Sequence, residues 1–162
     1  MCTNGCLEFG ASCLTAEAVR GCRVLEVGAR CVDFSLRPHV AALGPAEYVG
    51  VDLDPGEGVD EIADANNLIE RFGPESFDLV ISTEMLEHVP DWRNVIHHLK
   101  GVVRPGGRLL ITARAKGFRI HGYPQDYWRF ETDDLREIFS DFRILRIESV
   151  PAEPGAFLYA EK

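Results

Sequence analysis

Short apolar runs alternate with amphipathic stretches along this chain of 162 residues. Runs such as residues 23–27 and 77–82 are bounded by polar residues, Gly or Pro, and their length suits buried strands. Residues 91–103 instead place apolar side chains at helical spacing, which predicts a helix with one face on a sheet. This alternation is typical of a mostly parallel sheet covered by helices, an α/β fold.

Turn and cap residues set the bounds of the predicted elements. Ser35 and Thr132 are expected to cap two helices, and Pro105-Gly106-Gly107 is expected to form a tight turn. Strands are predicted at residues 23–27, 47–52, 59–62, 77–82, 108–113, 142–149 and 156–160, and helices at 35–43, 66–72, 91–103 and from 132 onward.

The segment between the second and third strands is too short for a helix. Only about seven residues separate these strands, whereas a helical crossover needs a dozen or more. The third strand is therefore expected to be a stub at the sheet edge or to pair unusually, and the last two strands are expected to be antiparallel. We predict one Rossmann-like domain over residues 1–162, with a mostly parallel seven-stranded sheet, an antiparallel last strand and no helix between strands two and three.

The net charge limits the classes of molecule that the protein is expected to bind. A net charge of −9 argues against nucleic acid, because a surface that follows phosphates is basic, and it favours a small molecule. No apolar run approaches the ~20 residues of a membrane span, and the first residues lack the pattern of a signal peptide. These features predict a cytoplasmic protein with no membrane segment. The edges of the last strand and of the third-strand stub leave a homodimer as an open alternative.

The cysteines give no signal for a metal centre. All five lie within the first 31 residues, and no two form a CxxC pair. Zinc and iron–sulfur sites usually have closer pairs, and cytosolic proteins rarely hold disulfides. Reduced thiols and no metal site are therefore expected. A metal held by His88, His121 and Asp126 is conceivable, but nothing in their spacing requires it.

The loop after the first strand excludes two common nucleotide sites. Residues 28–33 keep only the first glycine of the GxGxxG fingerprint, and no GxxxxGK[ST] pattern is present. Three acids surround the same sheet edge, where ligands of open α/β sheets bind. Glu26 precedes Gly28, Asp52 can accept both hydroxyls of a ribose, and Asp64 can accept from an amino group such as adenine N6. A cationic adenosyl ligand suits such an acidic cleft.

Six blocks of the sequence resemble, in order, the motifs of class I S-adenosylmethionine (SAM)-dependent methyltransferases. They are VLEVGAR (24–30), YVGVDLDPGEGVD (48–60), ADANNL (63–68), FDLVISTEMLEHV (77–89), VVRPGGRLLIT (102–112) and HGYPQDYWRF (121–130). The likeness is greatest to small bacterial members with an EHV block and an HxYPxDYWRF block. It covers residues 22–139 and implies a methyltransferase with SAM as its cofactor.

The resemblance also implies which residues bind the cofactor. It assigns the methionine end to Glu26, Gly28 and the segment 82–84, and the ribose to Asp52. The adenine is assigned to Leu53, with Asp64 and Ala65 at its edge. The full expected set is Glu26, Gly28, Ala29, Arg30, Asp52, Leu53, Asp64, Ala65, Ser82, Thr83 and Glu84. Arg30 departs from the family, because most relatives have a second glycine there. It can pair with the SAM carboxylate, or it can crowd the cleft.

The methyl acceptor is expected between two segments, because the last strand ends the chain without a further lid. These are the N-terminal cap segment 1–21 and the loop 116–130, which concentrates His121, Tyr123, Asp126, Tyr127, Trp128 and Arg129. Aromatic and ionisable side chains together are typical of a pocket. Alternatively, Tyr127, Trp128 and Phe130 pack the loop onto the last helix, while Asp126 pairs with Arg129.

Methyl transfer needs a base only for a hydroxyl or a protonated nitrogen. His88, His121 and Tyr127 are the candidate catalytic residues, although a structural hydrogen bond is an equally good interpretation of His88. The expected function is in-line methyl transfer to a small-molecule acceptor. The alternatives are a non-catalytic SAM-binding regulatory domain and a Rossmann-like domain that has lost its cofactor. Residues 82–85 read STEM rather than the NPPY of adenine methyltransferases, which disfavours nucleobase chemistry.

Overall fold

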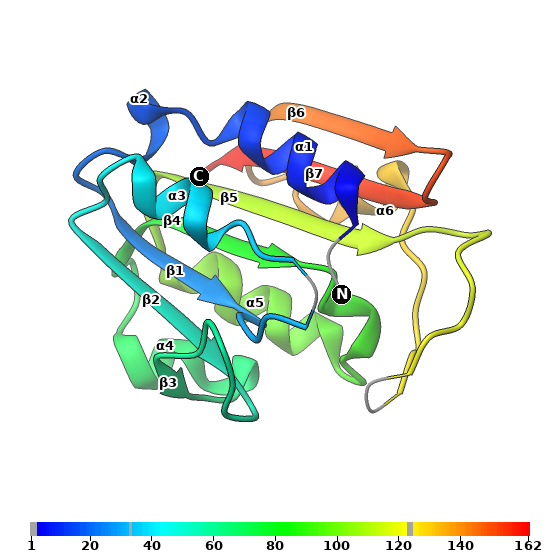
Figure 1. The fold of residues 1–162 in the computed structure, drawn as a ribbon, viewed down its shortest axis with the longest axis horizontal. Helices are drawn as coiled ribbons and strands as arrows, with labels where there is room; N and C mark the ends of the chain where they lie inside the picture. Colours follow the sequence, from blue (N-terminus) through cyan, green and yellow to red (C-terminus); the bar gives the residue numbers. More distant parts are fainter. Residues whose placement is uncertain (1–2, 33, 123–124) are drawn as a thin grey trace.

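Seven strands form one sheet in the order β3-β2-β1-β4-β5-β7-β6 (Figure 1). The computed structural model describes residues 3–32, 34–122 and 125–162. The strands are β1 Arg23–Val27, β2 Glu47–Asp52, β3 Glu61–Ile62, β4 Phe77–Thr83, β5 Val103–Arg114, β6 Arg143–Val150 and β7 Gly155–Glu161. Only β7 is antiparallel to its neighbours β5 and β6, and the other adjacent pairs are parallel. The predicted fold class is confirmed.

Helices cover both faces of this sheet. The α-helices are α1 Asn4–Cys13, α2 Ala16–Val19, α3 Arg37–Ala42, α4 Leu68–Phe72, α5 Trp92–Val102 and α6 Thr132–Ile138, and two short 3-10 helices are η1 Ala65–Asn67 and η2 Leu86–His88. Helices α1 to α3 lie on one face, whereas α4 to α6 lie on the other (Figure 1). None of the described helices is long and apolar enough to cross a membrane.

The core follows the two-residue period of the strands. Val24 and Leu79 belong to the buried cluster under α1 to α3, whereas Leu25 and Val80 belong to the cluster under α4 to α6. Successive side chains of a strand point to opposite faces, so a strand covered on both sides is apolar throughout. This explains why the central strands read as continuous apolar runs.

Two predicted helix caps were wrong by one residue. Glu131, not Thr132, caps α6, and it forms a capping box in which Asp134 accepts from the Glu131 backbone N–H at 2.8 Å. Leu36 occupies the N-cap position of α3, while the Ser35 hydroxyl still accepts from a backbone N–H of the first turn at 3.0 Å. Side chains next to a cap position can reach the same free N–H groups, so sequence fixes a helix start only approximately.

Other boundaries differ near the two ends of the sheet. Helices α1 and α2 lie within the segment expected only as an N-terminal cap, and Phe9 of α1 packs on Phe157 of β7 with ring centroids 5.4 Å apart. Strand β5 begins at Val103, so the expected turn at 105–107 is an irregularity within it, and Gly106 has a φ of +73°. No disulfide joins two of the four described cysteines, and Cys2 lies outside the described residues.

A loop replaces the helix that a crossover from β2 to β3 would contain. Residues 53–60 form no helix, and β3 pairs only with the end of β2 at the sheet edge, as predicted. The loop folds back onto β2, because Asp60 accepts from the Gly50 N–H at 2.7 Å and donates its own N–H to the Gly50 carbonyl at 2.8 Å. Arg37 of α3 donates to the Gly58 carbonyl at 2.7 Å and fixes the loop from the other side.

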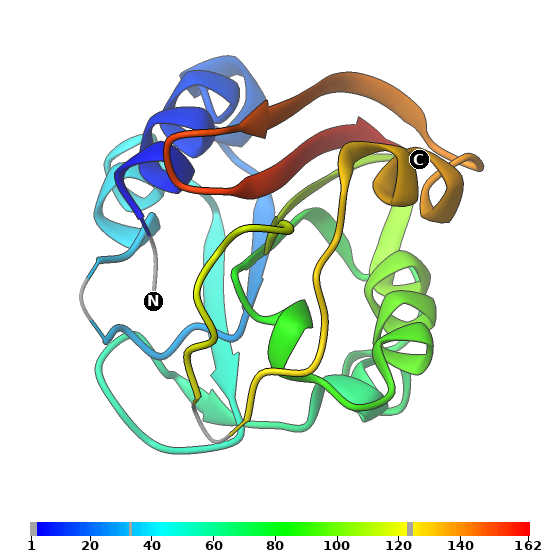
Figure 2. The ribbon, with the colours of Figure 1, turned by 90° about the vertical axis from the view of Figure 1, so that its right-hand side faces the viewer.

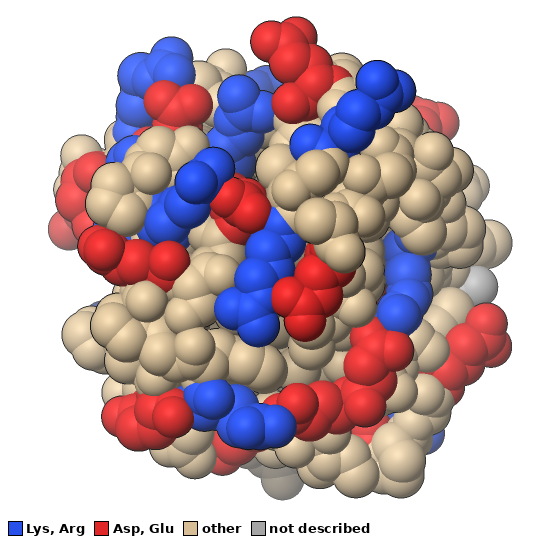
Figure 3. All heavy atoms as spheres, turned by 90° about the vertical axis from the view of Figure 1, so that its left-hand side faces the viewer, with Lys and Arg blue, Asp and Glu red and all other residues tan. Residues whose placement is uncertain are grey.

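Strands β1, β2, β4 and β5 point to the same edge of the sheet (Figure 1), and Figure 2 looks onto this edge. The segments that follow these strands meet there, including the loop after β5. Figure 3 shows the face at the opposite end of the strands, where basic and acidic side chains are interspersed.

Candidate functional site

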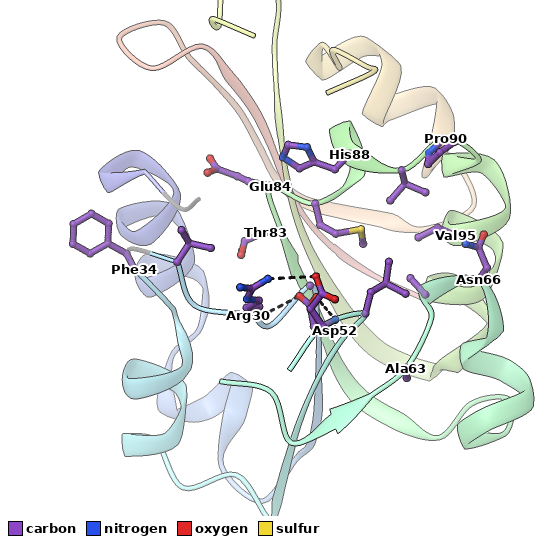
Figure 4. A pocket seen from close by; sticks show the side chains of 17 residues that line it. Arg30, Phe34, Asp52, Ala63, Asn66, Thr83, Glu84, His88, Pro90 and Val95 are labelled. Atoms are coloured by element: carbon purple, nitrogen blue, oxygen red, sulfur yellow. Dashed lines mark hydrogen bonds and ion pairs between the residues drawn. The ribbon is translucent and has the colours of Figure 1, made fainter. Parts of the chain in front are cut away.

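A cavity of about 240 Å³ lies at the carboxyl edge of the sheet (Figure 4). Its walls come from the segments after β1, β2, β3 and β4 and from the start of α5. Seven of the eleven residues expected to bind the cofactor line it, namely Gly28, Arg30, Asp52, Leu53, Ala65, Thr83 and Glu84. Sequence reasoning missed further lining residues, among them Phe34, Asn66 and Met85.

The other four expected residues, Glu26, Ala29, Asp64 and Ser82, do not line the cavity. Glu26 is buried, and its carboxylate accepts from the Tyr48 hydroxyl at 2.7 Å. Burial and this carboxylate raise the pKa of Tyr48 far above its ordinary value. Asp64 caps η1, where it accepts from the Asn66 N–H at 2.9 Å. These acids support the walls, and their expected contacts with a cofactor stay a prediction.

Gly28 brings the backbone after β1 close to the cavity. Its φ of +78° is in the left-handed region, which a side chain disfavours. A Cβ built at this position would lie 2.8 Å from Cγ of Met85, which also lines the cavity. The first glycine of the loop is therefore required for both its conformation and its packing.

Arg30 lies over the loop after β2. Its Nη1 is 3.4 Å from Asp54 Oδ2, and a Cβ built on Gly56 would lie 2.9 Å from Arg30 Cγ. Its backbone N–H donates to Asp52 Oδ2 at 3.1 Å, while the Asp54 N–H donates to Asp52 Oδ1 at 3.2 Å (Figure 4). Backbone N–H groups therefore hold both oxygens of the Asp52 carboxylate, which faces the cavity.

Glu84 joins the cavity to a buried arginine. Glu84 has a φ of +52°, and its Oε2 lies 2.5 Å from Nη2 of Arg114 at the end of β5. Both side chains are almost fully buried, which makes the pair far costlier to break than a surface pair. The Thr3 hydroxyl donates to the other oxygen at 3.3 Å, so the N-terminal segment also reaches this wall.

Two histidines meet beside the cavity. His88 lines it, and the His121 ring lies 4.8 Å from the His88 ring. His88 Nδ1 lies 2.6 Å from the Gln125 carbonyl, which can only accept, so this nitrogen carries the proton. His121 Nδ1 lies 2.9 Å from Asp126 Oδ2. Burial and the neighbouring His88 lower the pKa of His121, so this ring is neutral near pH 7.

Glu87 is buried behind the histidines. Neither of its carboxylate oxygens has a hydrogen-bond partner within the described residues, and burial raises its pKa. Donor atoms of Glu87, His88 and His121 lie within 4.8 Å of one another, close enough to share one metal ion. Nε of Arg114 lies 3.9 Å from Glu87 Oε1, so a positive charge already faces this carboxylate. The expectation that the chain holds no metal stays a prediction.

The rest of the loop 116–130 is divided between exposure and packing. Tyr127 does not line the cavity and is 45% exposed, while its backbone N–H donates to the Glu87 carbonyl at 2.8 Å. Phe130 is buried against Trp92, as the packing alternative predicts. Asp126 pairs with Arg129, which is also part of the packing alternative. Tyr123 lies outside the described residues.

The chain matches a family model described as a methyltransferase domain over residues 7–147. Among curated relatives, the ubiquinone biosynthesis O-methyltransferase of Xanthomonas euvesicatoria pv. vesicatoria is 34% identical over 111 residues, which are 60% of this chain and 45% of that protein. The chain spans about half the length of the curated relatives it matches.

Two solved structures illustrate the shared fold. One is the 1,6-didemethyltoxoflavin-N1-methyltransferase of Burkholderia thailandensis, solved with bound 1,6-didemethyltoxoflavin and S-adenosylhomocysteine (SAH). It has a TM-score of 0.75 and 20% identity, over 96% of this chain and 77% of that chain. The other is a SAM-dependent methyltransferase from Aquifex aeolicus, with a TM-score of 0.67 and 14% identity over 99% of both chains.

The TM-scores show that both structures share the fold of this chain. The likeness to one bacterial subgroup with EHV and HxYPxDYWRF blocks stays a prediction. The family model covers most of the chain and confirms the expected methyltransferase family. The expected cofactor, SAM, agrees with the solved structures, one of which holds SAH. This chain belongs to the methyltransferase-domain family, on the class I Rossmann-like fold.

Proposed function

We propose that this chain transfers a methyl group from SAM to a hydroxyl group of a small molecule. The observation that carries the proposal is an acidic cavity at the sheet edge with the rings of His88 and His121 in contact beside it. A hydroxyl acceptor needs a base, and an imidazole that is neutral near pH 7 can provide one.

The residues of the cavity fit the cofactor. Bound SAM supplies a methyl group on a positively charged sulfur, and the carboxylates of Asp52 and Glu84 favour a cation in this cavity. In this proposal Asp52, whose two oxygens are fixed by backbone N–H groups, holds the ribose, and Glu84 holds the amino group of the methionine end. Because Gly28 packs closely against Met85 and has no side chain, its backbone lines the cavity directly.

His88 is the proposed general base. It lines the cavity, and because its Nδ1 is held at the Gln125 carbonyl, its Nε2 carries the free lone pair. In this role Nε2 would accept the proton of the acceptor hydroxyl as its oxygen takes the methyl group that SAM supplies, which would leave SAH. His121 lies behind His88 and positions it, and the exposed Tyr127 is the weakest of the three expected catalytic residues.

Calorimetric titration with SAM and SAH tests the cofactor and its ribose anchor. We expect micromolar affinity for the intact chain and loss of binding in Asp52→Ala, because the variant removes the one carboxylate that both loops orient. Glu57→Gln removes a charge from the same loop at an exposed position and is the matched control. Absence of binding up to millimolar ligand would overturn the proposal.

Formation of SAH in the presence of hydroxyl-bearing acceptors then separates transfer from binding alone. Catechols, phenols and sugars cover the chemical range of small hydroxyl acceptors. Turnover that requires both SAM and one of these acceptors supports the proposal. Tight binding of SAM without turnover on any of them would instead favour the non-catalytic regulatory domain.

A further inference from the structure

A continuous set of contacts joins the two ends of the candidate site through Arg114. Glu84, which lines the cavity, lies 2.5 Å from the Arg114 guanidinium. The same guanidinium lies 3.8 Å from the centre of the Phe118 ring, in the loop after β5. The Phe118 ring contacts His121 at 5.2 Å, and His121 contacts His88 at 4.8 Å. The contacts therefore begin and end at residues that line one cavity.

Burial makes this arrangement rigid at its centre. Arg114 is 1% exposed and Glu84 is 3% exposed, so neither group can exchange its partner for water. A planar guanidinium can pair with a carboxylate at its edge while an aromatic ring covers its face, which an ammonium cannot do with the same geometry. Arg114 also anchors the far end of the loop, since its carbonyl accepts from the Phe130 N–H at 2.8 Å.

We propose that Arg114 is a positioning residue that couples occupancy of the methionine end of the cavity to the order of the segment that carries His121. The inference rests on the proposed function, because it assigns Glu84 to the amino group of the cofactor. A ligand that fixes the Glu84 carboxylate also fixes the guanidinium, and through it the Phe118 ring. By linkage, an ordered loop strengthens the binding of that ligand by the same factor.

Two ligands with a common adenosine separate this coupling from simple occupancy. SAH carries the amino-acid group that would reach Glu84, whereas 5′-methylthioadenosine lacks it. Hydrogen–deuterium exchange of the backbone amides of residues 118–121 is measured on the whole chain with each ligand at saturation. We expect SAH to slow this exchange about fivefold or more, the lower end of typical coupling, and methylthioadenosine to leave it unchanged. Equal effects of the two ligands, or none from either, would overturn the proposal.

A pair of loop variants tests the route of the coupling. Phe118→Leu keeps an apolar side chain but removes the ring between Arg114 and His121. Ile120→Ala is its control, because Ile120 is 85% exposed in the same loop. We expect Phe118→Leu to lose the protection of the loop and, by linkage, to bind SAH about fivefold or more weakly, and Ile120→Ala to keep both the protection and the affinity. The same protection in both variants would overturn the role of the ring.

Arg114→Lys tests the guanidinium itself. The variant keeps the charge next to Glu84 but loses the flat surface under Phe118, so we expect loss of loop protection and about tenfold weaker binding of SAH. Unchanged protection would contradict the proposal, and Phe118→Leu decides the question if the lysine variant does not fold. Failure of the unmodified chain to bind SAH would overturn the proposed function, whereas binding without loop protection would overturn only the coupling.

Discussion

At the residue scale, the acids around the cavity have three different environments. The oxygens of Asp52 accept from two backbone N–H groups, Glu84 pairs with a buried arginine, and Glu26 accepts from a tyrosine hydroxyl. Only the first two line the cavity. The chemistry of each carboxylate therefore depends on its partner rather than on its position after a strand.

The role of His88 as a base leads to a kinetic prediction. Replacing His88 with Gln should lower kcat about 10²–10⁴-fold for a hydroxyl acceptor, because general-base catalysis contributes about that much. The affinity for SAH should stay within a few-fold of the unmodified chain. Measured rates of SAH formation check this, with the exposed His97→Gln as the control histidine. Equal losses in both variants would rule out a specific role for His88.

The Asp126–Arg129 pair leads to a prediction about stability and pH. Arg129 holds the pKa of Asp126 well below its ordinary value, whereas an unfolded aspartate titrates near about 3.9. The pair therefore stabilises the fold fully above pH ~4, and this contribution is lost as the pH falls through the lower folded-state pKa. Asp126→Asn should reduce the free energy of unfolding by about 1–3 kcal/mol at pH 7.

Urea unfolding of both chains at a series of pH values is the measurement. The difference in the free energy of unfolding between the unmodified chain and Asp126→Asn should be constant between pH ~7 and ~5 and should shrink below pH ~4. Asp133→Asn removes a carboxylate whose side chain is 96% exposed and should change little at any pH. A difference that grows toward low pH would contradict the assignment.

Residue positions could be predicted from the sequence better than residue partners. Gly28 and Glu84 directly follow strands and Asp52 ends one, and in a parallel sheet such positions must meet at one edge. Glu26 is also at a strand end, but the alternation of side chains turns it toward Tyr48 instead. Glu87 could not be placed, because its burial depends on the loop after β5, which is distant in sequence.

At the element scale, the loop 53–60 takes the place of a helix and packs directly on β2. A Cβ added to Gly50 would lie 2.2 Å from the Gly58 carbonyl oxygen, which is backbone and cannot move aside cheaply. The length of this segment predicts that no helix forms. The loop that covers β2 in place of a helix is held by the pairing of Arg37 in α3 with Asp60 in the loop. This pairing has no local signal in the sequence.

Gly50→Ala should therefore be strongly destabilising. Overpacking of this kind costs about 1–3 kcal/mol, and a backbone neighbour puts this position at the upper end of the range. Chemical denaturation measures the loss. Gly5→Ala is the control, because its nearest atom would be a side-chain carbon of Val150 at 3.2 Å. Equal stability of Gly50→Ala and the unmodified chain would show that the loop is not packed on β2 as described.

At the scale of the whole molecule, the direction of the strands was predictable and the N-terminal helices were not. The short link between the last two strands predicts their antiparallel pairing, and the reversed β7 follows from it. Helix α1 was missed because Gly, Cys and Ser interrupt its apolar pattern. Its place on the sheet comes from distant contacts such as Phe9 with Phe157.

The mixed charges of the surface lead to a prediction about nucleic acid. Acidic and basic groups alternate on the face drawn in Figure 3, and the net charge is −9. We expect no binding of a labelled 20-base-pair DNA or RNA duplex up to about 100 µM protein at physiological salt, which is weaker than usual non-specific binding. Fluorescence anisotropy checks this. Micromolar binding that weakens steeply with added salt would contradict it.

The hydrogen bond from Thr3 to Glu84 has a practical consequence for any work with this chain. A fusion or affinity tag placed ahead of Thr3 would lie beside the wall of the cavity. The start of α1 is held in place because the Gly5 N–H donates to Glu153. The opposite end is held in the sheet, where Lys162 pairs with Gly107. Assays of ligand affinity are therefore best made on protein tagged after Lys162, with cleavage of any leading tag as a check.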